Sequence, residues 1–360
     1  MTKKVLLINQ GNSDNVGDRL INDTLSKLIG GNYCLESKSL EINYPDTPIE
    51  VAVEQRLMHT GHINTKFFLK SLINKLLRFL MSDYLFFYFK AIYKMTRYIK
   101  NSEFDIYVIG GGELLKSNHF FIPYMDAWTK MIKNYWPKKR LILFGVSSDQ
   151  HFTLREEKRL HTILKRFDFV NVRDNATLNV LYKDFAIKAH MSPDCVFVYN
   201  YFNQIKIEKE NKMLVSVFDY HSLPPNSEWK TKEEYFAYWF KLIKKNHSKG
   251  LTIKFIYTCA DDALCTLEFY KMYRKLLECI DINMKMDYKL DDIVIQIANA
   301  ESIITGRMHA MILAKQYNTK IVPFIFKNKI ACFVDEWINR EYNMETVLDE
   351  IQEQIERIIR

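Results

Sequence analysis

Short apolar runs that end in glycine or small polar residues recur along the first half of this 360-residue chain, and each is followed by a helical pattern. Examples are "KVLLINQ", "DIYVIGGG", "LILFGVSSD" and "FVNVRDNATLNVLY". Such runs are typical of strands that are buried on both faces of a parallel sheet and joined by crossover helices. Ligands of these sheets bind at the carboxyl ends of the strands, so we expect functional residues in the loops there.

A polar, charged stretch at 199–211 interrupts this alternation, and a second series of strands and helices follows it. We therefore predict two doubly wound α/β domains, residues 1–200 and 211–335. The last segment, 336–360, contains "NMETVLDEIQEQIERIIR", which is typical of an amphipathic helix with a charged outer face.

The composition is that of a soluble globular protein, with 48% apolar and 26% charged residues. The net charge of +8 is modest, and no zinc-finger spacing or RNP-like aromatic run accompanies it, so nucleic acid is not the expected partner. A small polyanion or an anionic membrane surface fits this charge equally well. The six cysteines form no CxxC pair, which indicates reduced thiols in a cytoplasmic protein and no metal site. The N-terminus has too short an apolar run for a signal peptide, and no run is long enough to span a membrane.

The segment 64–100 is rich in aromatic and basic residues and is expected to form a helical insertion in the first domain. Leu69, Ile73, Leu76 and Leu80 lie at helical spacing. A basic, aromatic amphipathic helix can lie on an anionic membrane surface. The alternative is helices that pack on the sheet while their lysines extend to solvent.

Two glycine-containing loops follow predicted strands. In "GNSDNVGDRLI", Gly11 and Gly17 permit tight turns, and the next helix could present backbone N–H groups to an anion. Its spacing fits neither GxGxxG nor the Walker loop. Asp18 stands at the helix start, where capping is the structural alternative to a functional role. In "IGGGELL", Gly110 to Gly112 allow a substrate or a neighbouring loop to approach the backbone, and a tight turn explains them equally well.

Two arginines lie at predicted strand ends. Arg173, in "NVRDNAT", is expected at the carboxyl edge of the sheet as an anion ligand or in a structural ion pair with Asp174. In "SIITGRMHAMILA", Gly306, Arg307 and His309 lie where a strand turns into a helix. A cation at a helix N-terminus is unfavourable unless an anion lies between them. Arginine suits phosphate or carboxylate, and histidine can deliver a proton near neutral pH, so this combination predicts a site.

With these motifs the sequence resembles the polysaccharide pyruvyl transferase family. The matching pieces cover nearly the whole chain in the family's order: "NSDNVGDRLI", "IGGGELL", "FGVSSD", "VRDNATLNVL", "MSPDCVF", "TGRMHAMILA" and "VPFIFKNK". The resemblance implies two Rossmann-like domains facing a cleft, as in GT-B glycosyltransferases. It also implies transfer of pyruvate from phosphoenolpyruvate onto two hydroxyls of one sugar in a bacterial surface polysaccharide, giving a cyclic ketal.

By this resemblance, Arg307 and His309 match the family's essential pair, and Arg173 matches a second anion-binding arginine. His309 is expected to deliver a proton or to hold the phosphate. The expected phosphoenolpyruvate ligands are Arg173, Arg307, His309, Gly111 and Gly112. The base that takes the hydroxyl proton is expected among Asp18, Glu113 and Asp149, and Asp18 is grouped with the catalytic residues. Residues with an acceptor-binding or undecided role are Asn15, Gly17, Glu113, Asp149, Asp194 and Lys329. No cofactor or metal is expected, because arginines supply the positive charge.

Two other functions remain open on sequence. A GT-B glycosyltransferase that uses a nucleotide sugar would need an acid for the ribose, for which Asp261 and Asp262 are the candidates. An inactive scaffold of polysaccharide assembly is the non-enzymatic alternative. For the pyruvyltransferase, the acceptor could be a free sugar, a lipid-linked oligosaccharide or finished polymer, and a lipid-linked acceptor would suit contact of 64–100 with the inner membrane leaflet.

Overall fold

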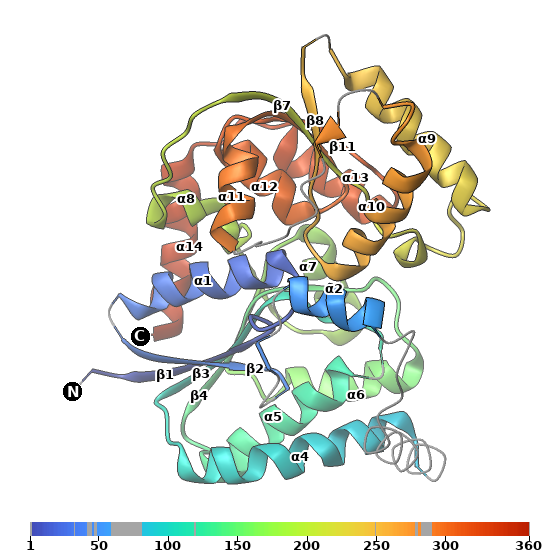
Figure 1. Cartoon of the computed structure of the whole chain (residues 1–360). Helices are drawn as coiled ribbons and strands as arrows, with labels where there is room; N and C mark the ends of the chain where they lie inside the picture. Colours follow the sequence, from blue (N-terminus) through green and yellow to red (C-terminus); the bar gives the residue numbers. More distant parts are fainter. Residues whose placement is uncertain are drawn as a thin grey trace.

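Two parallel β-sheets form the centres of two α/β domains, one above the other in Figure 1. The computed structural model describes residues 2–31, 33–41, 45–46, 49–58, 81–118, 120–248, 250–277, 280–281 and 290–359. The predicted fold class, two doubly wound α/β domains, is confirmed.

The first sheet has the strand order β2-β1-β3-β4-β5-β6, and each pair is parallel. Its strands are β1 (Lys4–Asn9), β2 (Cys34–Ser39), β3 (Ile106–Leu115), β4 (Arg140–Ser148), β5 (Phe169–Val172) and β6 (His190–Met191). Side chains alternate between its faces. Val5 and Leu7 of β1 join the core cluster that contains α1, whereas Leu6 and Ile8 join the cluster that contains α4 and α5. Both faces are thus buried, which explains the continuous apolar runs.

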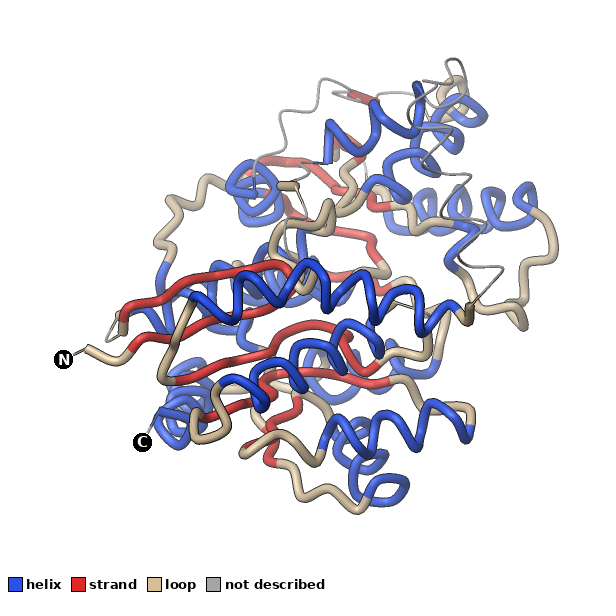
Figure 2. Tube along the Cα trace, turned by 90° about the horizontal axis from the view of Figure 1, so that it is seen from below, coloured by secondary structure: helices blue, strands red, loops and turns tan. Residues whose placement is uncertain are grey.

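The helices of this domain run alongside the strands, as the view from below shows (Figure 2). They are α1 (Val16–Gly30), α2 (Ile49–Met58), α4 (Asp83–Asn101), α5 (Phe121–Tyr135), α6 (Leu154–Leu164) and α7 (Asn175–Phe185). The short helices η1 (Cys195–Val198) and α8 (Tyr199–Phe202) follow β6.

Helix α4 is the described part of the predicted basic insertion; residues 59–80 lie outside the described residues. Its inner face, with Tyr88, Ala91, Met95 and Ile99, is buried in the core of the first domain. The inner face of α4 is therefore packed in the core of the first domain, as the second alternative for segment 64–100 predicts. Its outer face, with Leu85, Phe89 and Tyr93, is exposed.

The second sheet has the order β11-β10-β7-β8-β9 and is also parallel. Its strands are β7 (Glu210–Ser216), β8 (Thr252–Phe255), β9 (Ile280–Asp281), β10 (Ala300–Thr305) and β11 (Lys320–Pro323). Its helices are η2 (Tyr220–Ser222), α9 (Lys232–Asn246), α10 (Ala260–Tyr273), α11 (Leu290–Asn299), α12 (Met308–Gln316), α13 (Asn328–Phe333) and η3 (Val334–Ile338).

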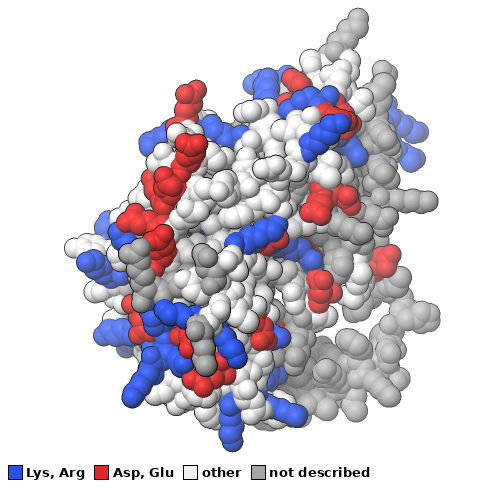
Figure 3. Space-filling model, turned by 90° about the vertical axis from the view of Figure 1, so that its left-hand side faces the viewer, with Lys and Arg blue, Asp and Glu red and all other residues white. Residues whose placement is uncertain are grey.

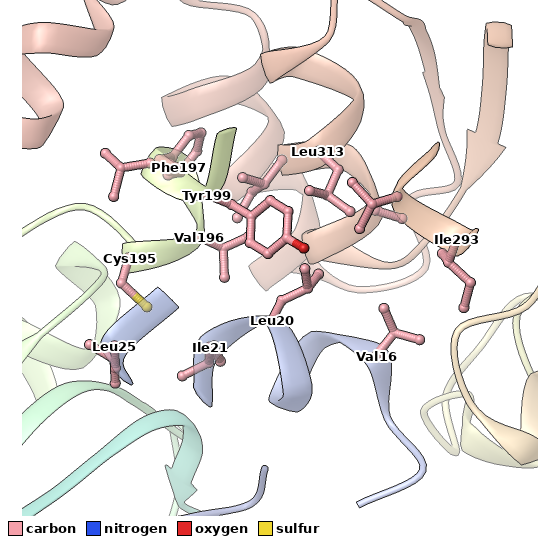
Figure 4. Close-up of a cluster of buried hydrophobic side chains, with 14 of the residues drawn as sticks. Val16, Leu20, Ile21, Leu25, Cys195, Val196, Phe197, Tyr199, Ile293 and Leu313 are labelled. Carbon is pink, nitrogen blue, oxygen red and sulfur yellow. The ribbon is translucent and has the colours of Figure 1, made fainter. Parts of the chain in front are cut away.

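An apolar junction joins the two domains. In Figure 4, Val16 and Leu20 of α1 lie below Ile293 of α11 and Leu313 of α12, with Val196 of η1 beside them, and all five belong to one core cluster. The last helix, α14 (Met344–Ile359), returns to the first domain. The predicted amphipathic helix buries part of its apolar face in the same cluster and so adds to the packing between the domains.

Basic and acidic side chains are mixed on the surface. On the face shown in Figure 3, the described Lys and Arg side chains lie among Asp and Glu side chains. Lys139, for example, contacts both Glu103 and Asp105 at 3.0 Å. Within the described ranges, no helix is long and apolar enough to cross a membrane.

Candidate functional site

The carboxyl ends of the two sheets meet at the domain junction. Thr258, after β8, accepts a hydrogen bond from the backbone N–H of Val16 (2.8 Å), and Asp14, after β1, accepts one from the N–H of Ala260 (3.1 Å). Strand order reverses beside β1 in the first sheet and beside β7 in the second. Such reversals are the places where α/β sheets bind ligands, and the loops after β1 and β10 beside them contain Asn15 and Arg307, whereas Arg173 follows β5.

Arg173 directly follows β5 and is buried at this junction, only 7% exposed. Its Nη1 donates to Asp194 Oδ2 (2.6 Å) and its Nη2 donates to Ser147 Oγ (3.0 Å). Asp194 also caps η1, because its Oδ1 accepts from the N–H of Val196 (2.9 Å). Burial would raise the pKa of Asp194, but Arg173 and His309 outweigh it and hold the pKa well below its usual range. The ion-pair alternative for Arg173 therefore holds, with Asp194 rather than Asp174 as the partner.

His309 reaches this pair from the other domain, as the second residue of α12. Its Nε2 lies 3.3 Å from Arg173 Nη1 and 3.5 Å from Asp194 Oδ2. Because a guanidinium only donates, the first contact requires a free lone pair on Nε2. When Nε2 carries a proton, it can no longer accept from Arg173, and Asp194 Oδ2 is the oxygen next to it. Gly17 of α1 packs against the other side of the ring, and a Cβ at this position would overlap His309 Nδ1.

Arg307 has a different environment from the one predicted. It is the N-cap residue of α12 rather than a member of its first turn, and the anion expected beside it is a protein carboxylate. Asp262 of α10 accepts from its Nε (2.7 Å) and its Nη2 (2.6 Å). The guanidinium also lies over the Phe218 ring at 4.3 Å. Asp262 thereby offsets the unfavourable cation at the helix N-terminus. Among the described contacts Arg307 does not meet Arg173, and the joint binding of phosphoenolpyruvate by the two arginines stays a prediction.

The glycines of β3 bring α1 close to the sheet. Gly111 and Gly112 have φ of +79° and +85°, values that side chains rarely adopt. A Cβ on Gly111 would overlap Ile21, and one on Gly112 would lie 3.3 Å from Asp18 Oδ1. The sequence predicts that either a substrate or a neighbouring loop approaches these glycines. In the structure a neighbouring element, helix α1, approaches them.

Asp18 lies between these glycines and His309. Ser13 Oγ donates to its Oδ2 (3.0 Å). Burial raises the pKa of Asp18, although His309 and Ser13 act in the opposite direction. Capping of α1 is performed by Asn15, whose Oδ1 accepts from the N–H of Gly17 (2.9 Å), so the capping alternative does not explain Asp18.

Glu113 and Asp149 are held by other partners. Lys329, the second residue of α13, donates to Glu113 Oε1 (2.6 Å) and to Ser147 Oγ (3.1 Å), a contact that crosses the domain junction. Burial would raise the pKa of Glu113, but Lys329, Lys327 and Lys116 lower it to about 2. Asp149 Oδ2 accepts from the N–H of Ser117 (2.7 Å) and has no hydrogen bond to His309 or to either arginine in the described part of the chain.

Sequence reasoning missed the role of three residues. Asp262 was considered only as a ribose ligand, and Ser147 and Lys327 were not considered. The sequence does place two acids, Asp261 and Asp262, after a strand of the domain that carries Arg307. Nothing in the sequence, however, pairs Asp262 with Arg307. The ribose candidates are both engaged by arginines: Asp262 by Arg307, and Asp261 by Arg56 of α2.

Known proteins agree with this architecture. The solved structures it resembles include the UDP-N-acetylglucosamine 2-epimerase from Rickettsia bellii, with a TM-score of 0.56 at 12% identity over 100% of this chain and 96% of that one. The UDP-GlcNAc 2-epimerase from Methanocaldococcus jannaschii gives 0.51 at 12% identity over 100% and 99%. S. aureus MnaA, solved with UDP, gives 0.53 at 11% identity over 97% and 90%. At such identities the likeness shows the fold alone, which is GT-B.

The sequence decides the family. A search of curated proteins gives no significant match. The sequence model of the polysaccharide pyruvyl transferases matches residues 15–328, a range that includes every site residue described above except Ser13, Asp14 and Lys329. The chain belongs to the polysaccharide pyruvyl transferase family, a transferase family, and has the GT-B fold.

Proposed function

We propose that this protein transfers pyruvate from phosphoenolpyruvate onto two hydroxyls of one sugar, in a bacterial surface polysaccharide or its lipid-linked precursor. The observation that carries the proposal, beside family membership, is the cluster of Arg173, Asp194 and His309, built from both domains at 3.3–3.5 Å from the imidazole. A histidine that can carry a proton, held beside an arginine–aspartate pair at a domain junction, suits a substrate with a carbon that must be protonated.

The reaction balances without a further reagent. Protonation of the methylene carbon makes it a methyl group and leaves an oxocarbenium-like centre at C2. One sugar hydroxyl adds to C2 and loses its proton, the C2–O bond to phosphate breaks, and the second hydroxyl closes the ketal. Of the two hydroxyl protons released, one balances the proton on the methyl group and the other leaves with phosphate.

Asp18 is the strongest of the three candidate bases. Its raised pKa places it nearer the range of useful general bases, and it lies beside His309. Glu113, with a pKa of about 2 and an ion pair to Lys329, is a poor proton acceptor. Asp149 is occupied by the N–H of Ser117. We therefore assign proton delivery to His309 and hydroxyl deprotonation to Asp18.

Phosphate release tests this function. The protein is incubated with phosphoenolpyruvate and a panel of galactose, mannose and N-acetylmannosamine acceptors, and acceptor-dependent phosphate and product mass are followed. A product heavier by one pyruvate ketal is expected, and His309→Asn should abolish it. Turnover of a UDP-sugar with no phosphoenolpyruvate consumed would show a glycosyltransferase instead. Absence of both activities, with the fold intact, would favour the scaffold.

We infer a lipid-linked acceptor and a reaction in the cytoplasm at the inner membrane face, and the exposed face of α4 supports this proposal. Leu85, Phe89 and Tyr93 are 39%, 54% and 86% exposed, and their spacing of four residues puts them on one stripe. Arg97 and Lys100 are exposed further along the helix, where anionic headgroups would attract them.

Vesicle binding tests the membrane contact. Co-sedimentation with vesicles containing anionic lipid is expected at low salt and, more weakly, at physiological salt. The double variant Phe89→Ser/Tyr93→Ser should lose it, whereas Tyr182→Ser, at a 72% exposed position of α7, should not. Equal binding by both variants, or none by the wild type, would refute the contact.

A further inference from the structure

Both arginines of the site are already neutralised. Arg173 is paired with Asp194 at 2.6 Å, and Arg307 holds both oxygens of Asp262 at 2.6 and 2.7 Å. A substrate phosphate that arrived at these arginines would have to compete with carboxylates that are 4% and 0% exposed. Positive charge that is free to meet a phosphate must therefore come from other residues.

Three lysines at the domain junction supply an excess of positive charge. Lys329 and Lys116 contact Glu113 at 2.6 and 3.5 Å, and the positive charge of Lys327 also stabilises the ionised carboxylate of Glu113. Lys116 and Glu113 belong to the first domain, and Lys327 and Lys329 to the second. Three ammonium groups share Glu113, so the cluster carries net positive charge. Burial lowers the pKa of Lys327, and Lys329 and Lys116 lower it further, while Glu113 and Asp149 act in the opposite direction.

The cluster keeps unused hydrogen-bond donors. A lysine ammonium has three N–H groups. Lys329 uses them on Glu113 and Ser147, which leaves one, and Lys116 makes a single long contact. The Lys327 ammonium has no hydrogen bond to any described residue and lies over the Phe326 ring at 5.6 Å. A phosphate group offers the acceptor oxygens that these donors lack.

Ser147 connects the cluster to the catalytic side chains. Its hydroxyl oxygen accepts from Lys329 Nζ (3.1 Å) and from Arg173 Nη2 (3.0 Å). Arg173 also keeps a buried Nε with no partner among the described residues. Lys329 is therefore linked through one hydroxyl to Arg173, which contacts His309.

We propose that Lys116, Lys327 and Lys329 form a phosphate-binding subsite beside the Arg173–His309 cluster, with a phosphate monoester or diphosphate as ligand. This rests on the proposed function for its place in the reaction. Two substrates could bring the group: the donor carries a phosphate ester, and an acceptor linked to a lipid or nucleotide carries a diphosphate. Because the lysines come from both domains, such a ligand would also hold the domains together.

Binding measurements test the subsite without relying on turnover. Inorganic phosphate, phosphoenolpyruvate, pyruvate and UDP are titrated by calorimetry into the wild type, Lys327→Gln, Lys329→Gln and the control Lys245→Gln. Lys245 is an exposed lysine of α9 in the same domain. Each site variant should lower the affinity for phosphate-bearing probes at least about tenfold, which is the contribution of one charged hydrogen bond. The affinity for pyruvate should be unchanged. The control should match the wild type.

The pattern among probes identifies the source. Weaker phosphoenolpyruvate binding with unchanged UDP binding assigns the subsite to the donor, and the reverse assigns it to the acceptor's diphosphate. Unchanged affinity for all three phosphate-bearing probes, no binding of them by the wild type, or equal loss of pyruvate binding would overturn the proposal. Lys327→Gln breaks no ion pair among the described residues, so it separates ligand binding from folding. Loss of binding in an enzyme that makes no ketal would refute the proposed function and leave the subsite standing.

Discussion

Arg307→Ala tests whether the arginine at the start of α12 is held by the protein rather than by a substrate. The substitution removes both hydrogen bonds to Asp262, whose carboxylate is fully buried, and the contact with the Phe218 ring. Asp262 would keep only the backbone N–H of Asp219 as a hydrogen-bond donor among the contacts described (3.0 Å). A charge left buried without its partner is strongly destabilising.

The magnitude follows from the burial of the pair. Breaking a buried ion pair costs about 3–5 kcal/mol. The Arg307 side chain is 24% exposed, so water can partly replace it and the lower end, about 3 kcal/mol, applies. With an unfolding entropy of about 2.1 cal/mol/K per residue, a cooperative chain of 360 residues would melt about 4 °C lower. The fold therefore survives at 25 °C, while transfer is lost because α12 no longer places His309.

Urea unfolding followed by tryptophan fluorescence measures the effect, in a cycle of Arg307→Ala, Asp262→Asn and the double variant. The double variant leaves no unpaired charge, so its loss of stability should be smaller than the sum of the single losses by at least about 1 kcal/mol. Lys206→Ala, which breaks an ion pair at an 86% exposed side chain, should change stability by less than about 0.5 kcal/mol. The buried ion pair would be refuted if the single variants were as stable as the wild type and if the stability change of the double variant equalled the sum of the single changes.

Three further predictions concern residues near His309. Burial raises the pKa of Asp18 from 3.8, so the contribution of this carboxyl to stability falls as pH rises from there through the raised value. Asp18→Asn should remove this fall in urea unfolding and lower transfer at least about 10²-fold; an unchanged pH dependence would contradict the burial of this carboxyl. Glu113, with its pKa lowered from 4.5 to about 2, contributes stability above pH 4.5 that is lost as pH falls toward 2, and Glu113→Gln should abolish that loss. A variant with the wild-type acid profile would contradict its pairing. Gly17→Ala should displace His309 and lower turnover about 10²-fold, whereas Gly30→Ala in the same helix, where an added Cβ finds no atom closer than 3.9 Å, should not; equal turnover in the two would contradict the packing of Gly17 on the imidazole.

Much of the fold was predictable because apolar periodicity is a local signal. The runs before Gly11 and Gly112 marked strands that are buried on both faces, and both became strands of a parallel sheet. Their carboxyl ends could be placed in advance, since all strands of such a sheet point the same way. For this reason Arg173 and His309 could be assigned to the site region without knowledge of the distance between them.

The partners of these residues could not be predicted in the same way. Arg307 pairs with Asp262, 45 residues away in the chain, and Lys329 reaches Glu113 across the domain junction. Each pairing depends on how α10 and α13 pack, which sequence spacing does not record. The glycines of β3 were noticed, but only packing shows that Ile21 of α1 is what approaches Gly111.

By itself the sequence determined the family, the two α/β domains and the edge of each sheet where function resides, because strand burial, helix periodicity and motif order are written in neighbouring residues. Only the tertiary structure decided which charges are free. Arg173 and Arg307, the two arginines that the motifs single out, are paired with Asp194 and Asp262. The excess of positive charge lies instead with the lysines around Glu113, because an ion pair forms between side chains that are close in space, whatever their separation in sequence.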